Sequence, residues 1–137
     1  PRNLSGPVPT FYQRLVGGKK CFVVNTRRDF VFIDDLVEIV MKAIDGKGKG
    51  YYHISTGKDF SIRELYDNVS NVLDMDVKAE ERERGKDDVE TILLDPGKTT
   101  DEFGFLPKTP LLDGVRAATI WYRSNPVSET FTHLKMK

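Results

Sequence analysis

The stretch that decides the fold is residues 27–44, which read Arg27-Arg28-Asp29-Phe30-Val31-Phe32-Ile33-Asp34-Asp35-Leu36-Val37-Glu38-Ile39-Val40-Met41-Lys42-Ala43-Ile44. After two arginines, a short apolar run predicts a strand over residues 29–33. Asp35, with Glu38 three residues later, is typical of a capping box, so a helix is predicted to follow. Apolar residues recurring at intervals of three and four predict one buried helix face, formed by Leu36, Ile39, Val40, Ala43 and Ile44.

The amino-acid composition limits which kinds of protein this chain can be. The 137 residues, 39% of them hydrophobic and 31% charged, suit one globular domain with a modest core. The 21 basic and 21 acidic residues cancel, so nothing favours nucleic acid or a membrane surface as a partner. A single cysteine, Cys21, excludes an internal disulfide and favours a reducing compartment, the cytoplasm. The chain opens on Pro1 rather than methionine, and we expect it to be a piece of a longer protein.

Helices and short strands alternate along the rest of the chain. Helices are predicted from Pro9 to Val16, from Ser61 to about Asp74, after Asp95-Pro96 as far as Gly104, and from Thr109-Pro110 to Asn125. Strands are predicted over residues 21–24 and 51–55, with a short edge strand at 77–81, and residues 91–94 are a short apolar segment. The clearest helix start is Ser61-Ile62-Arg63-Glu64, a capping box. The coarse class is therefore α/β or α+β, and we expect an α/β class: a small mixed domain of short strands and about five helices.

Several residues could carry chemistry, and each also has a structural interpretation. Arg27 and Arg28 could bind a phosphate through paired hydrogen bonds, or form surface pairs with nearby aspartates. Asp34 and Asp35 could be a metal or acid–base pair, although helix capping explains them more simply. The loop containing Arg82 and Arg84 could clamp an anion or be solvated.

Other candidates favour structural interpretations. Cys21 is interpreted as a small buried hydrophobe. His53 and His133 show no metal-ligand spacing. Gly46 to Gly50 lacks the Lys-Ser/Thr pair of a phosphate loop and is interpreted as a turn.

Taken together, the segments resemble the C-terminal part of the NAD(P)-dependent nucleotide-sugar epimerases and dehydratases, the extended short-chain dehydrogenase/reductase family. The strongest piece is residues 28–35, which are similar to the family element R-D-[FYW]-x-[YH]-[VI]-x-D. Residues 52–57, 95–98, 103–107 and 112–114 resemble further family motifs in the same order. The resemblance extends from Pro1 to about Arg123 and implies a C-terminal lobe without the complete Rossmann sheet.

The resemblance implies the substrate-binding residues. Arg28 is similar to the arginine that binds the diphosphate of the nucleotide sugar, and Arg84 to a second phosphate-binding arginine, although its loop departs from the family's R-x-G-D. Pro7-Val8-Pro9 resembles the segment that approaches the substrate's base and sugar. Phe22 and Val24 are similar in place to residues that line the base pocket. The six implied substrate-binding residues are Arg28, Arg84, Val8, Pro9, Phe22 and Val24.

The same resemblance implies that the family's cofactor-binding and catalytic motifs lie outside these residues. The family's glycine-rich cofactor loop and its Tyr-x-x-x-Lys are absent from this sequence, so we expect no catalytic, cofactor-binding or metal residues here. We expect residues 1–124 to be the nucleotide-sugar-binding lobe and residues 125–137 a tail. NAD or NADP would be bound by the full-length enzyme and not by this piece, which is expected to be inactive alone.

The implied partners are a nucleotide-diphosphate sugar and the N-terminal Rossmann half of the same protein, with a homodimer left open. The full protein is expected to be a sugar epimerase. A 4,6-dehydratase or reductase is the alternative, and a non-catalytic nucleotide-sugar-binding module is another.

Overall fold

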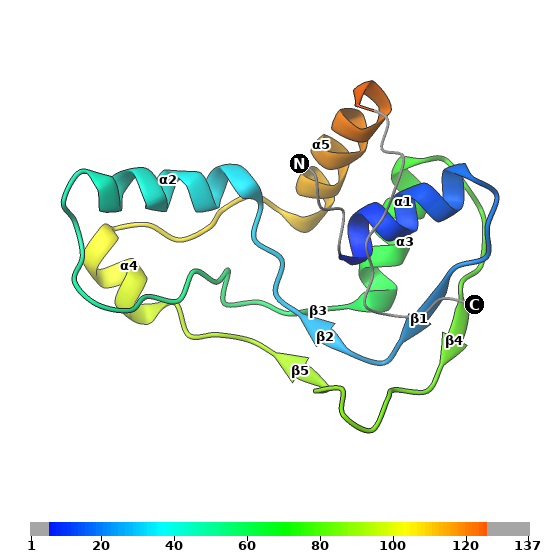
Figure 1. Ribbon diagram of the computed structural model, residues 1–137, viewed down its shortest axis with the longest axis horizontal. Helices are drawn as coiled ribbons and strands as arrows, with labels where there is room; N and C mark the ends of the chain where they lie inside the picture. The colour runs from blue at the N-terminus through cyan, green and yellow to red at the C-terminus, as the bar shows by residue number, and fades with distance from the viewer. Residues whose placement is uncertain (1–5, 126–137) are drawn as a thin grey trace.

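The structure, a computed structural model, describes residues 6–125 (Figure 1). Ten short elements follow one another along the chain: α1 Pro7–Val16, β1 Phe22–Val24, β2 Arg27–Arg28, α2 Ile33–Ile44, β3 Phe60–Ser61, α3 Ile62–Val72, β4 Glu80–Arg82, β5 Thr91–Ile92, α4 Gly97–Phe103 and α5 Leu111–Ser124. They form two groups: α1, α3, α5, β1 and β4 lie at one end, and α2 and α4 at the other. Strands β2, β3 and β5 lie between the groups. The expected mixture of five helices and short strands is confirmed.

Each group has its own apolar cluster. The larger cluster lies among α1, α3, α5 and β1, and its buried members are Phe11, Leu15, Cys21, Val23, Leu65, Tyr66, Val69, Ala79 and Val115. The smaller one joins α2 to α4 and the segment after it, with Ile39, Phe103 and Phe105 buried and with Tyr52 and Ile54 packed against them. Cys21 is 1% exposed and burial raises the pKa of its thiol, which agrees with its interpretation as a small hydrophobe.

Helix α3 is the centre of the larger cluster. Its predicted capping box is present: the Ser61 hydroxyl accepts a hydrogen bond from the Glu64 amide, and the Glu64 carboxylate accepts one from the Ser61 amide. Leu65 and Val69 are fully buried, and the Tyr66 ring meets Phe11 edge to face at 5.2 Å. Local start signals and a long apolar face thus agree, and the helix forms where the sequence predicts it.

The strands form two small sheets. β1 pairs in parallel with β4, with Phe22 opposite Glu80 and Val24 opposite Arg82. In the second sheet, β2 lies between β3, which is antiparallel to it, and β5, which is parallel. The predicted edge strand over residues 77–81 is shifted to Glu80–Arg82, and the apolar segment 91–94 contributes only Thr91–Ile92.

The prediction for residues 29–35 is wrong. The strand is Arg27–Arg28, before the predicted 29–33, and α2 begins at Ile33 with Phe32 rather than Asp35 at the N-cap. Asp35 lies in the first turn, is 3% exposed, and accepts a hydrogen bond from the Thr109 amide at 3.0 Å. Burial opposes its ionisation, but hydrogen bonds from Thr109 and Lys108 hold the pKa of Asp35 below its ordinary value. Its partner lies 74 residues away, so the local spacing to Glu38 could not reveal it.

Two further predictions are wrong, and both are wrong for the same physical reason. Residues 51–55 form no strand, and most of the predicted buried face of α2 is open: Val40 is 45% exposed and Ile44 70%, with Ala43 also exposed, while Ile39 is buried and Leu36 half-buried. A strand needs a neighbouring backbone, and an apolar face needs a covering layer. Residues 6–125 supply neither at these places.

The other helix boundaries differ from prediction by one or two residues. α1 begins at Pro7 rather than Pro9, and α4 and α5 follow Pro96 and Pro110 as N-cap residues instead of including them. Gly104 ends α4 as predicted, in the left-handed region at φ 63°. His133 and the predicted tail beyond Asn125 lie outside the described residues.

The capping box gives a stability prediction. Ser61→Ala removes the hydroxyl that accepts from the Glu64 amide, so we expect the free energy of unfolding to fall by about 1 kcal/mol. Denaturant titration followed by circular dichroism measures it. Ser124→Ala, at the exposed last residue of α5, is the control and should leave the midpoint unchanged. Equal effects of the two substitutions would contradict the capping role.

Asp35 gives a pH prediction. Because its folded pKa lies below the ordinary value, ionised Asp35 stabilises the fold above that value. This contribution is lost as the pH falls through the folded pKa. We therefore expect Asp35→Asn to flatten the loss of unfolding free energy below about pH 5, where carboxylates begin to titrate. Its exposed neighbour is the control: Asp34→Asn should keep the wild-type slope.

Candidate functional site

The two neighbouring arginines of β2 have different partners. Arg27 Nε donates to Asp59 Oδ2 at 2.7 Å, and Glu64 lies 3.8 Å from its guanidinium. The hydrogen bond from Arg27 holds the pKa of Asp59 below its ordinary value. Arg28 Nη1 donates only to carbonyls, that of Arg27 at 2.7 Å and that of Glu90 at 3.2 Å. Among residues 6–125, no carboxylate forms an ion pair with Arg28, so its charge is not neutralised by the fold.

Arg84 approaches Arg28 through a shared residue, Glu90. Arg84 Nη1 donates to the Asp88 carbonyl at 2.7 Å, and its Nη2 lies 3.5 Å from the Glu90 carboxylate. The Glu90 carbonyl accepts from the Arg28 guanidinium and from the Arg27 amide. Both arginines implied by the family resemblance therefore contact Glu90, Arg28 at its backbone carbonyl and Arg84 at its carboxylate. A guanidinium group is suited to bind a phosphate through charge-assisted hydrogen bonds.

Phe22 and Val24 share one face of β1, because side chains alternate along a strand and Val23 between them is buried in the larger cluster. Both are half-buried. The Arg82 guanidinium lies 4.1 Å from the centre of the Phe22 ring and also pairs with Glu80 at 3.0 Å. This face thus offers an aromatic ring with a cation on it, a surface suited to a planar base.

Val8 and Pro9 lie in the first turn of α1. Pro9 is buried, whereas Val8 is half-buried and lines a cavity of about 570 Å³ between the 30–34 segment and α5. The cavity wall is mainly apolar and includes Phe30, Phe32 and Trp121. Of the six implied substrate-binding residues, only Val8 belongs to this cavity. The cavity is therefore a separate feature from the arginine pair.

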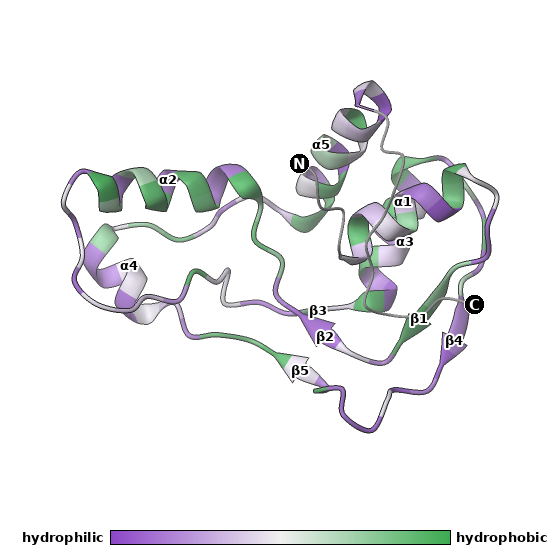
Figure 2. Cartoon of the chain, viewed as in Figure 1, coloured by the Kyte–Doolittle hydropathy of each residue, from purple (hydrophilic) through white to green (hydrophobic). Residues whose placement is uncertain are grey.

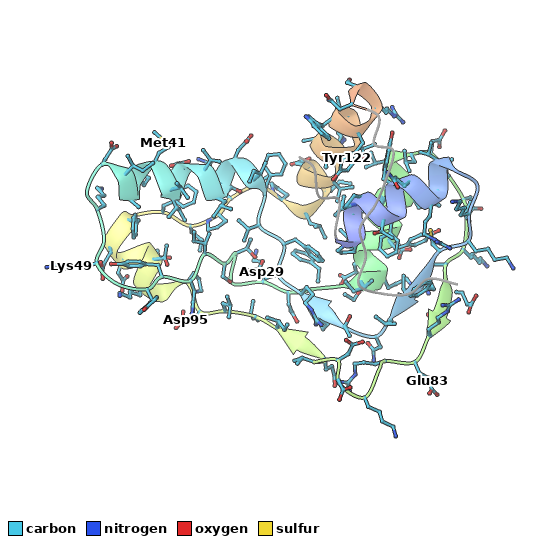
Figure 3. The ribbon with its side chains drawn as sticks, viewed as in Figure 1. Asp29, Met41, Lys49, Glu83, Asp95 and Tyr122 are labelled. Carbon is cyan, nitrogen blue, oxygen red and sulfur yellow. The ribbon has the colours of Figure 1, made fainter. Side chains whose placement is uncertain are left out.

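Asp29 fixes the backbone beside Arg28. Asp29, labelled in Figure 3, directly follows β2, and its carboxylate accepts hydrogen bonds from the Thr56 amide at 2.7 Å and from the Thr56 hydroxyl at 2.5 Å. The neighbouring Ser55 is 1% exposed and donates to the Leu94 carbonyl at 2.7 Å. The turn at residues 55–58 is thereby attached both to the residue after β2 and to the segment after β5. Asp29 therefore holds the 55–58 turn against the residue that follows Arg28.

The other sequence candidates do not assemble into a site. Asp34 is exposed, and the Asp35 carboxylate already accepts a hydrogen bond from the Thr109 amide. Within residues 6–125, no three His, Cys, Asp or Glu side chains are placed to hold a metal ion. Residues 46–50 form a loop in which Gly48 lies against Phe103, so a side chain there would collide with the ring. No helix of the described residues is long and apolar enough to cross a membrane.

Similar proteins are found among solved structures but not among protein-family models. No protein-family model matches the chain. The crystal structure of the Bordetella bronchiseptica enzyme WbmH in complex with NAD+ is 49% identical, with a TM-score of 0.85 over 93% of this chain and 43% of that one. The B. bronchiseptica enzyme WbmG in complex with NAD and UDP is 36% identical, with a TM-score of 0.86 over 100% of this chain and 45% of that one.

A curated plant relative agrees with these structures. The "Probable UDP-arabinose 4-epimerase 1" of Oryza sativa subsp. japonica is 29% identical over 102 residues, which are 72% of this chain and 24% of that protein. The resemblance to the extended short-chain dehydrogenase/reductases is confirmed. This chain corresponds to their C-terminal part. It spans less than half the length of each of these three proteins.

Glu90 contacts both arginines, and sequence reasoning did not single it out. It comes two positions after the dense charge run of residues 80–88, and its residue type does not distinguish it from the carboxylates there. The only available signal was its place immediately before a short apolar segment that becomes β5.

The unequal partners of the two arginines give a further prediction. Arg27→Ala removes the contacts to Asp59 and Glu64, so we expect it to lower the denaturant midpoint more than Arg28→Ala, which removes bonds to carbonyls alone. The difference should shrink in 1 M salt, because the Arg27 contacts are ionic and partly exposed. A larger loss for Arg28→Ala at low salt would contradict these assignments.

Proposed function

We propose that the chain is the nucleotide-diphosphate-sugar-binding lobe of an NAD-dependent sugar epimerase, with Arg28 and Arg84 as the ligands of the diphosphate. The observation that carries the proposal is the meeting of these two arginines at Glu90, with the Arg28 charge unpaired by any described carboxylate. The presence of UDP in the WbmG complex and the epimerase names among the relatives support the same substrate class.

The proposed roles follow from the chemistry of each group. Arg28 holds a phosphate by charge-assisted hydrogen bonds, and Arg84 exchanges its contact with Glu90 for the second phosphate. Phe22 and Val24 form a flat apolar surface for the base, beside the Arg82 guanidinium. Val8 and Pro9 lie at the start of α1, from which we propose that the base and sugar are approached. Fixing the diphosphate in this way orients the sugar for reaction.

The chemical step itself needs groups that this sequence does not contain. NAD or NADP, bound elsewhere in the full-length enzyme, accepts and returns a hydride. The sequence has neither a glycine-rich cofactor loop nor a Tyr-x-x-x-Lys. We therefore propose that an N-terminal Rossmann half of the same protein supplies both, and that the 137 residues alone are inactive. A homodimer and a cytoplasmic location belong to the same proposal.

A titration of UDP into the chain, followed by calorimetry, tests the proposal. Charge-assisted hydrogen bonds contribute roughly 1.5–3 kcal/mol each, so Arg28→Ala should raise the Kd at least about tenfold. Arg84→Ala should have a smaller effect, because its side chain is already paired with Glu90. Arg28→Lys should lie between the wild type and Arg28→Ala, since an ammonium cannot form two parallel hydrogen bonds.

Arg116→Ala is the control, because Arg116 is an exposed arginine on α5 that pairs only with Asp113 in the described chain. Its Kd should stay within about twofold of the wild type. Equal losses in Arg116→Ala and Arg28→Ala would show that only net charge matters. An unmutated chain that gives no heat at millimolar UDP would contradict binding by this lobe alone.

A further inference from the structure

The two strands of the β1–β4 sheet differ in character. Figure 2 shows β1 coloured as hydrophobic and β4, beside it, as hydrophilic. The strands run in parallel, so residues that are opposite each other in register share one face of the sheet. One such face carries two apolar side chains, one acidic and one basic: Phe22, Val24, Glu80 and Arg82. We call this set the mixed face.

The opposite face of the same two strands holds the sheet against the rest of the chain. Val23 is buried in the larger cluster, against which neither Phe22 nor Val24 packs. Glu81 accepts a hydrogen bond from Arg63 of α3 at 2.9 Å. The contacts that position the sheet therefore use the opposite face, and the side chains of the mixed face are not needed for them.

Arg82 has hydrogen-bond donors without partners on the mixed face. Its Nε donates to Glu80 at 3.0 Å, and its guanidinium lies 4.1 Å from the centre of the Phe22 ring, diagonal to its register partner Val24. Within residues 6–125, neither Nη group of Arg82 has a hydrogen-bond partner. A guanidinium carries donors only, so a ligand of Arg82 must present acceptors.

We propose that Arg82 selects the base of the nucleotide and favours a pyrimidine with a carbonyl oxygen at C4, such as uracil, over cytosine. A base that lies over Val24, beside the guanidinium, brings its edge to the Nη groups. Arg82 donates to the O4 of uracil, whereas the N4 amino group of cytosine is itself a donor and leaves those N–H groups unpaired. The inference rests on the proposed function, because it takes the base to lie on the surface of Phe22 and Val24.

The position of Arg82 in the chain suits this role. It lies two residues before Arg84, the proposed ligand of a phosphate, so their backbones are at most about 7 Å apart. A nucleotide places a ribose between its base and its phosphates and can span such a separation. One nucleotide therefore reaches both arginines.

Glu80 is the competing polar group of the mixed face, since a carboxylate accepts from the amino group of cytosine. Its carboxylate is already paired with Arg82 Nε, whereas the Nη groups of Arg82 have no partner in the described chain. The capacity that remains unfilled next to the Phe22 ring is thus that of donors. The mixed face therefore favours uracil.

Paired titrations of UDP and CDP into the chain, followed by calorimetry, test the proposal. The two ligands share their ribose and diphosphate, so the ratio of their Kd values reports on the base alone. We expect CDP to bind at least about tenfold more weakly than UDP. Arg82→Ala should bring the two Kd values within about twofold of each other. Arg82→Lys should give an intermediate ratio, because it keeps the charge but not the planar fork.

Arg63→Ala is the matched control, because Arg63 pairs with Glu81 on the opposite face of the same strand. It should keep the wild-type ratio within about twofold, and circular dichroism should show all variants folded. Arg28→Ala should raise both Kd values and leave their ratio unchanged.

The outcomes separate this inference from the proposed function. Equal affinity for the two nucleotides, a preference for CDP, or an unchanged ratio in Arg82→Ala would overturn base selection by Arg82. If Arg28→Ala still weakens binding in that case, the proposed phosphate site stands. A chain that binds neither nucleotide at millimolar concentration would contradict both.

Discussion

The arrangement of the described elements depends on strand β2, which is paired along both of its edges. The Arg27 amide donates to the Glu90 carbonyl at 2.7 Å, and the Thr26 carbonyl accepts from the Ile62 amide at 3.0 Å. Through these bonds, a strand of two residues joins the start of α3 on one side to the segment that leads to α4 on the other. The two apolar clusters lie at opposite ends of the molecule, and β2 lies where their connecting segments meet. Arg28 therefore lies on a strand that is paired along both edges.

The pairing of β2 also explains why the charge of Arg27 is neutralised by carboxylates while that of Arg28 is not. Alternation along β2 directs the two side chains to opposite faces. Asp59 and Glu64 lie on the Arg27 side, near the capped start of α3, and neutralise its charge. On the other face, Arg28 reaches only carbonyls, whose partial charges orient the guanidinium without cancelling it. An anion at Arg28 thus needs to displace no carboxylate, whereas at Arg84 it must compete with Glu90.

Sequence reasoning succeeded where the determining contacts are local. The capping box at Ser61, the apolar face of α3 and the glycine that ends α4 all depend on residues within a few positions of each other. It failed at Asp35, whose partner Thr109 is distant in the chain. The residues alone also could not separate Arg27 from Arg28, because the distinction comes from Asp59, 32 positions away, and from Glu90, 62 positions away. Only the family resemblance singled out Arg28.

The failures at α2 and at residues 51–55 are of a different kind. There the pattern in the sequence is sound: the helix forms, and the segment alternates as a strand does. What is missing is the second surface, since burial and strand pairing are properties of two segments and not of one. In the described residues, these segments therefore keep local signals whose second surface is absent. A disagreement of this type leaves the local pattern intact and shows only that the partner surface is not among the described residues. At Asp35, by contrast, the local signal itself was misinterpreted, and its partner lies within the described chain.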